Sequence, residues 1–267
     1  MNEVGFNREY SMLLVRYRVL KERAASLIES LHALVNIIGP NIKARYMMFI
    51  GHLEYKVYEL NVELMRWRRR FALRQAALNC GEKPDRAAIE DTLEEEFAEY
   101  MEKINSHIKE IKADEKHFFA EKLTDEENTE VRVAYLNAVK KLHPDLNPDL
   151  PEEARHLWDE IQAAYSMRDW AAVVALAELV DAVLAGTVEF PASSDGMAAM
   201  RKACDRLEAQ CRGIADETER IKKKAPFTYE AVLGDKRKIK ARQRKLKEAI
   251  IAMKAKIEKY KEEWGNV

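Results

Sequence analysis

The sequence predicts an all-α protein, and three observations support this fold class. Apolar residues recur at alternating spacings of three and four over long stretches near both ends of the chain, a pattern typical of coiled-coil seams. Glycine occupies only 9 positions and 34% of the residues are charged, a balance that favours long, solvated helices. No segment shows the regular apolar–polar alternation of a half-buried strand.

Two long helices are predicted at the N-terminal end, over 10–38 and 46–78. Gly39 and Pro40 should end the first helix, because proline removes a backbone donor and cannot continue a helix. The second helix should end before Cys80. A short connection makes consecutive helices antiparallel neighbours, so we expect a helical hairpin. The first seam consists of Tyr10, Leu13, Tyr17, Leu20, Ala24, Leu27, Leu31, Leu34 and Ile38.

A third helix is predicted from Asp85 to Ile111, which completes a region of coiled-coil helices over 1–113. Its first turns are acidic, and negative charge suits the N-terminal end of a helix. We expect these carboxylates to face a group of arginines on the second helix. The acidic residues are Glu90, Asp91, Glu94, Glu95 and Glu96, and the arginines are Arg66, Arg68, Arg69 and Arg70.

Two helices around a proline-rich loop are predicted in mid-chain, over 131–142 and 152–167. Both carry apolar residues at helical spacing. Three prolines between them exclude helix, because each removes a donor and pushes the preceding residue out of the α region. We therefore expect a hairpin that displays His143, Pro144 and Asp145 at its tip.

These motifs resemble the J domain of the DnaJ co-chaperone family, and the resemblance covers 114–186. The family's His-Pro-Asp tripeptide is intact at His143, Pro144 and Asp145. An Ala-Tyr pair and two lysines precede the tripeptide, as on the family's second helix. An Ala, an aromatic residue, an Ile and a second Ala-Tyr pair follow it, as on the third. The preceding residues are Ala134, Tyr135, Lys140 and Lys141, and those that follow are Ala154, Trp158, Ile161, Ala164 and Tyr165.

The resemblance implies docking on a DnaK-type (heat-shock-70) chaperone and stimulation of its ATP hydrolysis. By that resemblance, Lys140, Lys141 and Arg132 supply steering charge toward an acidic chaperone surface. Asp145 accepts hydrogen bonds from a chaperone arginine, His143 braces the loop and touches the partner, and Pro144 fixes the loop's shape. The core that holds the tip comprises Tyr135, Trp158, Ile161 and Tyr165.

The chain departs from the family pattern in several places. The roles of the family's first helix fall to Phe118, Phe119 and Leu123, on what we expect to be the tail of the long third helix. Leu136 and Asn137 stand where the family often has Arg and Lys, so the basic face is thinner. The zinc module and the Gly/Phe-rich segment of full DnaJ proteins are missing. We therefore expect a specialised member.

Three further segments complete the predicted organisation. Asp169 should cap a fourth helix that begins at Trp170. Residues 187–196 are predicted to form a linker, and 197–267 an antiparallel helical hairpin that bends at Pro226. Its seams are Met200, Cys204, Leu207, Cys211, Ile214, Thr218 and Ile221, and Ile239, Gln243, Leu246, Ile250, Met253, Ile257, Tyr260 and Trp264.

No residue set predicts enzymatic chemistry, a cofactor or a metal ion. The three cysteines lack metal-ligand spacing, the six histidines are scattered, and no phosphate loop or nucleophile motif occurs. We expect a non-enzymatic protein with no catalytic residues. The N-terminus lacks a signal peptide and the longest apolar stretch is too short and too charged to span a bilayer. No membrane partner is expected. A cytoplasmic location is expected.

One strong single-sign patch lies at 236–247, where eight cations and no carboxylate occur. Such a tract can hold nucleic acid phosphates or an acidic membrane surface. The alternative is a solvated helix face balanced by carboxylates of a neighbouring helix. We favour the solvated face, because Ile239 and Leu246 belong to a heptad seam and no aromatic residues interleave for base stacking. No nucleic acid partner is therefore expected.

Two functions from different classes remain. The first is a J-domain co-chaperone whose coiled coils serve as client or localisation arms. The second is a structural scaffold in which the J-like hairpin is a packing module without chaperone activity. The intact tripeptide favours the first function. The client is not identified, and the seams can be satisfied within one chain or in a homo-oligomer, since heptads do not fix the number of partners.

Overall fold

The computed structural model describes residues 3–119, 123–185 and 193–265. Its regular structure is helical throughout, with no strand in these ranges, which confirms the all-α prediction. The chain forms two compact units, Met1–Gly39 with Glu121–Phe227, and Pro40–Ala120 with Thr228–Val267. These units cut across the predicted segments, because each long N-terminal helix packs on a C-terminal helix within its own unit.

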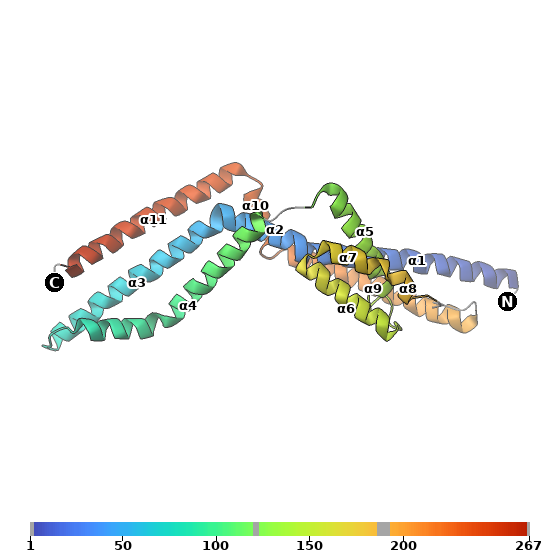
Figure 1. The fold of residues 1–267 in the computed structure, drawn as a ribbon, viewed down its shortest axis with the longest axis horizontal. Coiled ribbons are helices and arrows are strands. Elements are labelled where there is room, and N and C mark those ends of the chain that lie inside the picture. Colours follow the sequence, from blue (N-terminus) through green and yellow to red (C-terminus); the bar gives the residue numbers. More distant parts are fainter. Residues whose placement is uncertain (1–2, 120–122, 186–192, 266–267) are drawn as a thin grey trace. The chain divides into compact units, whose positions relative to one another are not determined.

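The first unit is built on a pair of long helices, α1 (Glu3–Ala33) and α9 (Ser194–Lys222). They lie side by side and run in the same direction (Figure 1). The ion pairs between them show this direction, since Glu9 pairs with Arg201 and Arg16, further along α1, pairs with Glu208, further along α9. Part of each predicted seam is buried, whereas Ile38, the last residue of the first seam, is 43% exposed. Buried seam residues are Leu13, Tyr17, Leu20 and Ala24 on α1, and Met200, Cys204, Leu207 and Cys211 on α9.

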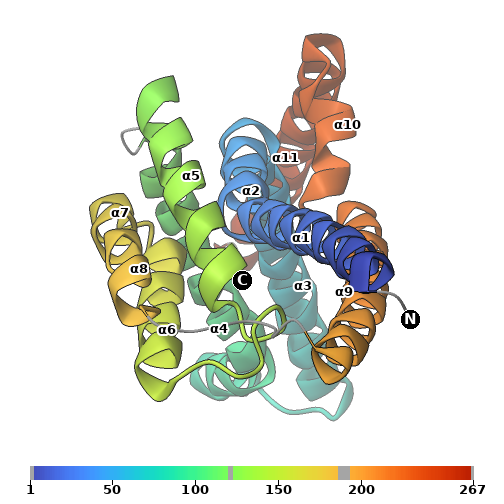
Figure 2. The same cartoon turned by 90° about the vertical axis from the view of Figure 1, so that its right-hand side faces the viewer.

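A cluster of shorter helices completes the first unit: α5 (Asp125–Leu142), α6 (Glu152–Met167), α7 (Trp170–Glu178) and α8 (Val180–Val183). Thr124 and Glu127 form a capping box that begins α5, as predicted. The Asp169 carboxylate accepts a hydrogen bond from the Ala172 N–H and begins α7. Figure 2 shows α5 between α1 and α7. The α5–α6 hairpin predicted from the prolines is present.

Phe118 and Phe119, the predicted counterparts of the family's first helix, belong to the second unit, whereas α5 belongs to the first. Both residues end α4 in the second unit, where the Phe118 ring lies edge-on to Phe49 at 6.2 Å and Phe119 is 68% exposed. Leu123 does pack against the core of the first unit. The hairpin is covered by α7, whose Val173 side chain is fully buried there. The helix that packs on the hairpin is therefore α7, which follows it in sequence, whereas the family resemblance implies a helix that precedes it.

The predicted helix end at Gly39 and Pro40 is also wrong. A π-helical turn, η1 (Leu34–Ile38), carries the backbone directly into α2 (Gly39–Tyr46). Proline removes the donor that would bond the carbonyl four residues earlier, that of Asn36. The Arg168 guanidinium donates a 2.7 Å hydrogen bond to this carbonyl instead. The helix therefore continues because a distant side chain satisfies the group that the proline leaves without a donor.

Gly39 has a packing role in place of the predicted helix-ending one. A Cβ at this position would lie 3.2 Å from Cζ of Phe227 and 3.2 Å from the Leu34 carbonyl oxygen. Both distances are tighter than ordinary van der Waals contact. A side chain at this position would require the Phe227 ring or the Leu34 carbonyl to shift by a few tenths of an ångström.

The second unit comprises α2, the π-helical turn η2 (Met47–Gly51), α3 (His52–Asn79), α4 (Arg86–Phe119), η3 (Phe227–Tyr229), α10 (Glu230–Leu233) and α11 (Lys236–Gly265). α3 and α4 are antiparallel neighbours, joined through Gly81 in the left-handed region. α11 packs on α3 and runs in the same direction, since Arg242 pairs with Glu54 and Tyr260 contacts Phe71. The predicted N-terminal and C-terminal hairpins are therefore replaced by the parallel pairs α1–α9 and α3–α11.

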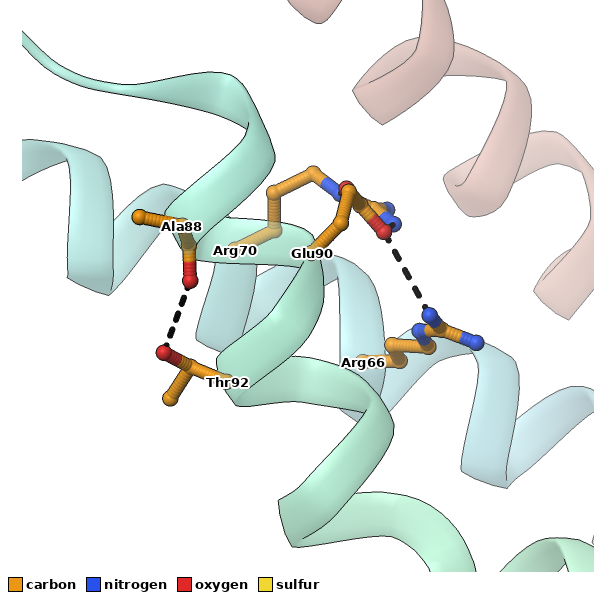
Figure 3. Close-up of polar contacts among 5 residues, drawn as sticks. All are labelled: Arg66, Arg70, Ala88, Glu90 and Thr92. Carbon is orange, nitrogen blue, oxygen red and sulfur yellow. Dashed lines mark hydrogen bonds and ion pairs between the residues drawn. The ribbon is translucent and has the colours of Figure 1, made fainter.

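The predicted charge pairing between the second and third long helices is confirmed for two acidic residues. Arg70 donates two hydrogen bonds, of 2.6 and 2.7 Å, to the Glu90 carboxylate, and Arg66 donates a third of 3.3 Å. Figure 3 shows both arginines reaching from α3 to Glu90 on α4. Arg69 forms a similar two-pronged pair with Glu96. Such forked pairs fix the register of the two helices.

No helix among residues 3–119, 123–185 and 193–265 combines the length and the apolar character that crossing a bilayer requires.

Candidate functional site: the hairpin tip

The loop between α5 and α6 is held by backbone and side-chain hydrogen bonds around His143. The His143 carbonyl accepts hydrogen bonds from the N–H groups of Leu146 and Asn147, at 3.0 and 2.9 Å. The Asn147 amide also bonds the Lys140 carbonyl at 3.1 Å, which satisfies an end group of α5. Leu146 is buried to 1% exposure. The loop is therefore a fixed turn anchored to the core.

The His143 imidazole braces this turn from within. Its Nδ1 accepts a 3.2 Å hydrogen bond from the Asp145 N–H, so this nitrogen carries no proton in that contact. The ring lies edge-on to Trp158, with the ring centroids 5.1 Å apart. Burial lowers the pKa of His143, and the Asp145 carboxylate offsets part of this shift. A neutral, half-buried imidazole thus fixes the position of Asp145.

Pro144 and Asp145 form the exposed apex of the turn. The predicted core beneath them is buried, with Tyr135 stacked on Tyr165 at a 3.8 Å centroid distance and on Trp158 at 6.0 Å. The apex therefore presents a carboxylate on a rigid base. This arrangement can do one kind of chemistry well, which is to accept hydrogen bonds from a cationic partner group.

The three cations predicted to steer docking lie on α5, and each forms an ion pair within the first unit. Lys140 pairs with Glu22 of α1, and Lys141 pairs with Asp181 of α8. The Arg132 Nε lies 3.3 Å from the Glu29 carboxylate of α1. We call Arg132, Lys140 and Lys141 the cationic face of α5. The structure thus brings the predicted residues onto the same hairpin and places acidic partners opposite them.

A cavity of about 390 Å³ is lined by residues of α1, η1, α5 and α6. The His32 Nδ1 and the Tyr135 hydroxyl share a 2.7 Å hydrogen bond at its wall. Burial, together with the neighbouring His143, lowers the pKa of His32 from 6.5 to about 4. His32 is therefore neutral at physiological pH. The polar residues that line the cavity are His32, Asn36, Tyr135, Asp159, Gln162, Tyr165 and Ser166.

Acidification is expected to destabilise the first unit through His32. The unfolded chain takes up a proton near pH 6.5, whereas the folded protein does so only near pH 4. Between these values the unfolded state binds more protons, so stability is full above about pH 7 and declines as the pH falls toward 4. The Tyr135 and His143 rings lie next to the His32 ring, and Asp159 lines the same cavity.

The measurement is the thermal unfolding midpoint at about pH 7 and about pH 5. Wild-type protein should lose more of its midpoint on acidification than His32→Gln, whose amide can still bond Tyr135 but takes up no proton. Equal losses in the two proteins would show that His32 is not the group responsible.

Sequence reasoning missed the residues of α1 and α9 that surround the tip. Glu22, Glu29 and His32 lie outside the seam of α1, where charged positions are ordinarily read as solvated. Gln210 of α9 donates a 3.0 Å hydrogen bond to the Asp145 carbonyl. Only the arrangement of helices distant in sequence reveals these contacts. No local pattern could have revealed them.

The basic tract of α11 has few acidic partners. All eight cations between Lys236 and Lys247 are exposed. Within the described ranges, Arg242 pairs with Glu54 of α3 and Arg244 with Glu248 of its own helix. The neighbouring helix thus balances less of this charge than the solvated-face interpretation assumed. That interpretation now depends mainly on water and mobile counterions.

Metal chemistry finds no support among the residues described. Within 3–119, 123–185 and 193–265, no three His, Cys, Asp or Glu side chains come close enough together to hold an ion. Cys204 and Cys211 are buried in the α1–α9 seam, and burial raises the pKa of both thiols. They are core residues, as predicted.

Comparison with known proteins gives no further information on the site. No family model matches the chain. No curated protein and no solved structure matches it either.

Proposed function

We propose that the chain is a J-domain-like co-chaperone that docks on a DnaK-type chaperone and stimulates its ATP hydrolysis. The observation that carries the proposal is the hairpin tip, where His143 fixes the turn and Asp145 is exposed at its apex. A carboxylate on a rigid base can form charge-assisted hydrogen bonds with a partner arginine at little cost in conformational entropy. The flanking helices carry the sequence pattern of that family.

The cationic face of α5 has a kinetic role in this proposal. Arg132, Lys140 and Lys141 attract an acidic chaperone surface over distances beyond direct contact, which raises the association rate more than the affinity. Leu136 and Asn137 add no charge, so the attraction is modest. The chain itself performs no bond-making chemistry and uses no cofactor.

The remaining helices supply attachment. The long pairs α1–α9 and α3–α11 are client or localisation arms in this proposal. We place the protein in the cytoplasm, because its cysteines are all free and a reducing compartment maintains thiols.

The decisive test is the ATP turnover of a purified DnaK-type chaperone from the same organism, measured with increasing amounts of the full chain. We expect turnover to rise with concentration and to saturate. A turnover that stays at the basal rate, for wild-type protein and for the Glu22→Gln/Glu29→Gln variant described below, would reject the co-chaperone function.

The second candidate is a scaffold in which the hairpin only packs. The observation in its favour is that all three cations of α5 have acidic partners within their own unit. A failed turnover test would leave this function in place.

A further inference from the structure

α1 lies across α5 and presents carboxylates to two residues of its cationic face, Arg132 and Lys140. Glu22 and Glu29 are two helical turns apart on α1 and meet Lys140 and Arg132, which are about two turns apart on α5. Between these pairs the helices approach closely, since Ala25 is fully buried and Ile28 is 4% exposed. The contact continues at His32, which bonds Tyr135. The contact is thus continuous over three turns of α1.

Glu29 shows that this contact is built into the fold. Its side chain is only 4% exposed, whereas that of Arg132 is 64% exposed. A buried carboxylate requires a partner, because an uncompensated buried charge is strongly unfavourable. The Ser30 hydroxyl also donates a 3.4 Å hydrogen bond to it. Arg132 therefore has a fixed counter-ion, unlike a surface cation that pairs only intermittently.

The tip itself is also held by α9. Gln210 of α9 donates its hydrogen bond to the Asp145 carbonyl, so both long helices contact the hairpin near its working end. The Gln210 side-chain oxygen is buried and has no hydrogen-bond partner among the described residues. An unsatisfied polar atom weakens the contact that creates it. The contact between Gln210 and the tip is therefore formed, but it is weaker than one in which every polar atom has a partner.

We propose that α1 occupies the docking face of α5 in place of the chaperone. The structure is then a closed, self-masked form of the chain, in which α1 covers cations that the chaperone would contact. This inference rests on the proposed co-chaperone function and adds its regulation. α1 offers carboxylates to the cations that an acidic chaperone surface would otherwise meet. A cation already paired with Glu22 or Glu29 has less attraction left for another anion, so docking requires the α5–α6 hairpin to move away from α1.

The two contacts of α1 differ in kind, which decides the element that moves. Its contact with α9 is a long apolar seam of residues such as Leu13, Tyr17 and Leu20. Its contact with α5 is less extensive and mixed, because two ion pairs and one hydrogen bond accompany the buried Ala25 and Ile28. The Glu22–Lys140 pair is about half exposed, so it contributes little and weakens with salt, whereas the longer apolar seam with α9 does not weaken with salt. Opening therefore separates α5 from α1 and leaves α1 on α9.

The test removes the masking charges and leaves the docking residues unaltered. Glu22→Gln/Glu29→Gln should stimulate the DnaK-type chaperone at a lower concentration than wild-type protein does. When the competent form is about a tenth of the molecules, full opening lowers the half-maximal concentration about tenfold. The matched control is Glu9→Gln, which removes an α1 carboxylate that pairs with Arg201 of α9, and it should behave as wild type.

A second readout follows the masking itself. Acetylation of the Lys140 amine, measured by mass spectrometry against the exposed Lys247, should become faster in Glu22→Gln/Glu29→Gln. Should the buried Glu29 position reduce folding, Glu22→Gln alone retains the test, because both members of its pair are about half exposed. Its effect should be in the same direction and smaller.

The outcomes separate the two proposals. If wild-type protein and the double variant stimulate with the same half-maximal concentration, the masking is wrong and the co-chaperone function stands. If neither stimulates at any concentration, the co-chaperone function is wrong, and its regulation is rejected with it. An equal loss or gain in Glu9→Gln would trace the effect to α1 stability and would overturn the masking as well.

Discussion

An Asp145→Asn variant is expected to bind a DnaK-type chaperone about thirtyfold more weakly than wild-type protein and to lose its stimulation of ATP turnover. Losing a charge-assisted contact at the centre of an interface can cost about 2 kcal/mol or more, which corresponds to that factor. The fold should not change, because Asp145 is exposed and its structural bonds are made by backbone groups that asparagine retains. Its unfolding free energy should move by about half a kcal/mol or less.

The matched control is Asp149→Asn, which neutralises another exposed carboxylate of the same loop. It should stimulate turnover as wild type does. Stimulation that survives Asp145→Asn, or that is lost equally in Asp149→Asn, would contradict the assigned role of Asp145. His143→Gln is a less specific variant, because His143 also packs on Trp158 and braces the turn.

A Trp158→Ala variant should lose about 3–5 kcal/mol of unfolding free energy in the first unit. The indole is 3% exposed and contacts both the Tyr135 ring and the His143 ring. Removing it leaves a cavity in the centre of the hairpin and withdraws the support of the tip. Marginal stabilities of about 5–15 kcal/mol make such a loss a large fraction of the total.

The measurement is chemical denaturation followed by circular dichroism. Met167→Ala is the control, because this side chain lies on the same helix but is 79% exposed, and its unfolding free energy should change by about half a kcal/mol or less. A Trp158→Ala transition that coincides with wild type would show that the hairpin does not depend on this core.

The helices and the tip could be predicted from sequence because their causes are local. The proline-rich loop fixes the ends of α5 and α6, and the Thr124–Glu127 capping box marks the start of α5. The spacing of seam residues such as Leu13 and Leu207 is enough to predict that they are buried. The rigid turn around His143 follows from the same loop.

The partners of the helices could not be predicted, because their causes are distant in sequence. A heptad seam does not specify which other seam packs against it, so the pairing of α1 with α9 and of α3 with α11 could not be predicted. The helix through Pro40 depends on a bond from Arg168 to the Asn36 carbonyl. Glu22 and Glu29 likewise face α5 only because α1 packs where it does.

The pairing of α1 with α9 has a consequence for folding during synthesis on the ribosome. Bonded residues of the two helices are separated by 192 positions, so the apolar seam of α1 is synthesised long before its partner. At about 5–20 residues per second, the delay is roughly 10–40 s. The α5–α6 hairpin, made of neighbours in sequence, can form during this interval. The tip can therefore form on the nascent chain before α9 is available to cover the apolar seam of α1.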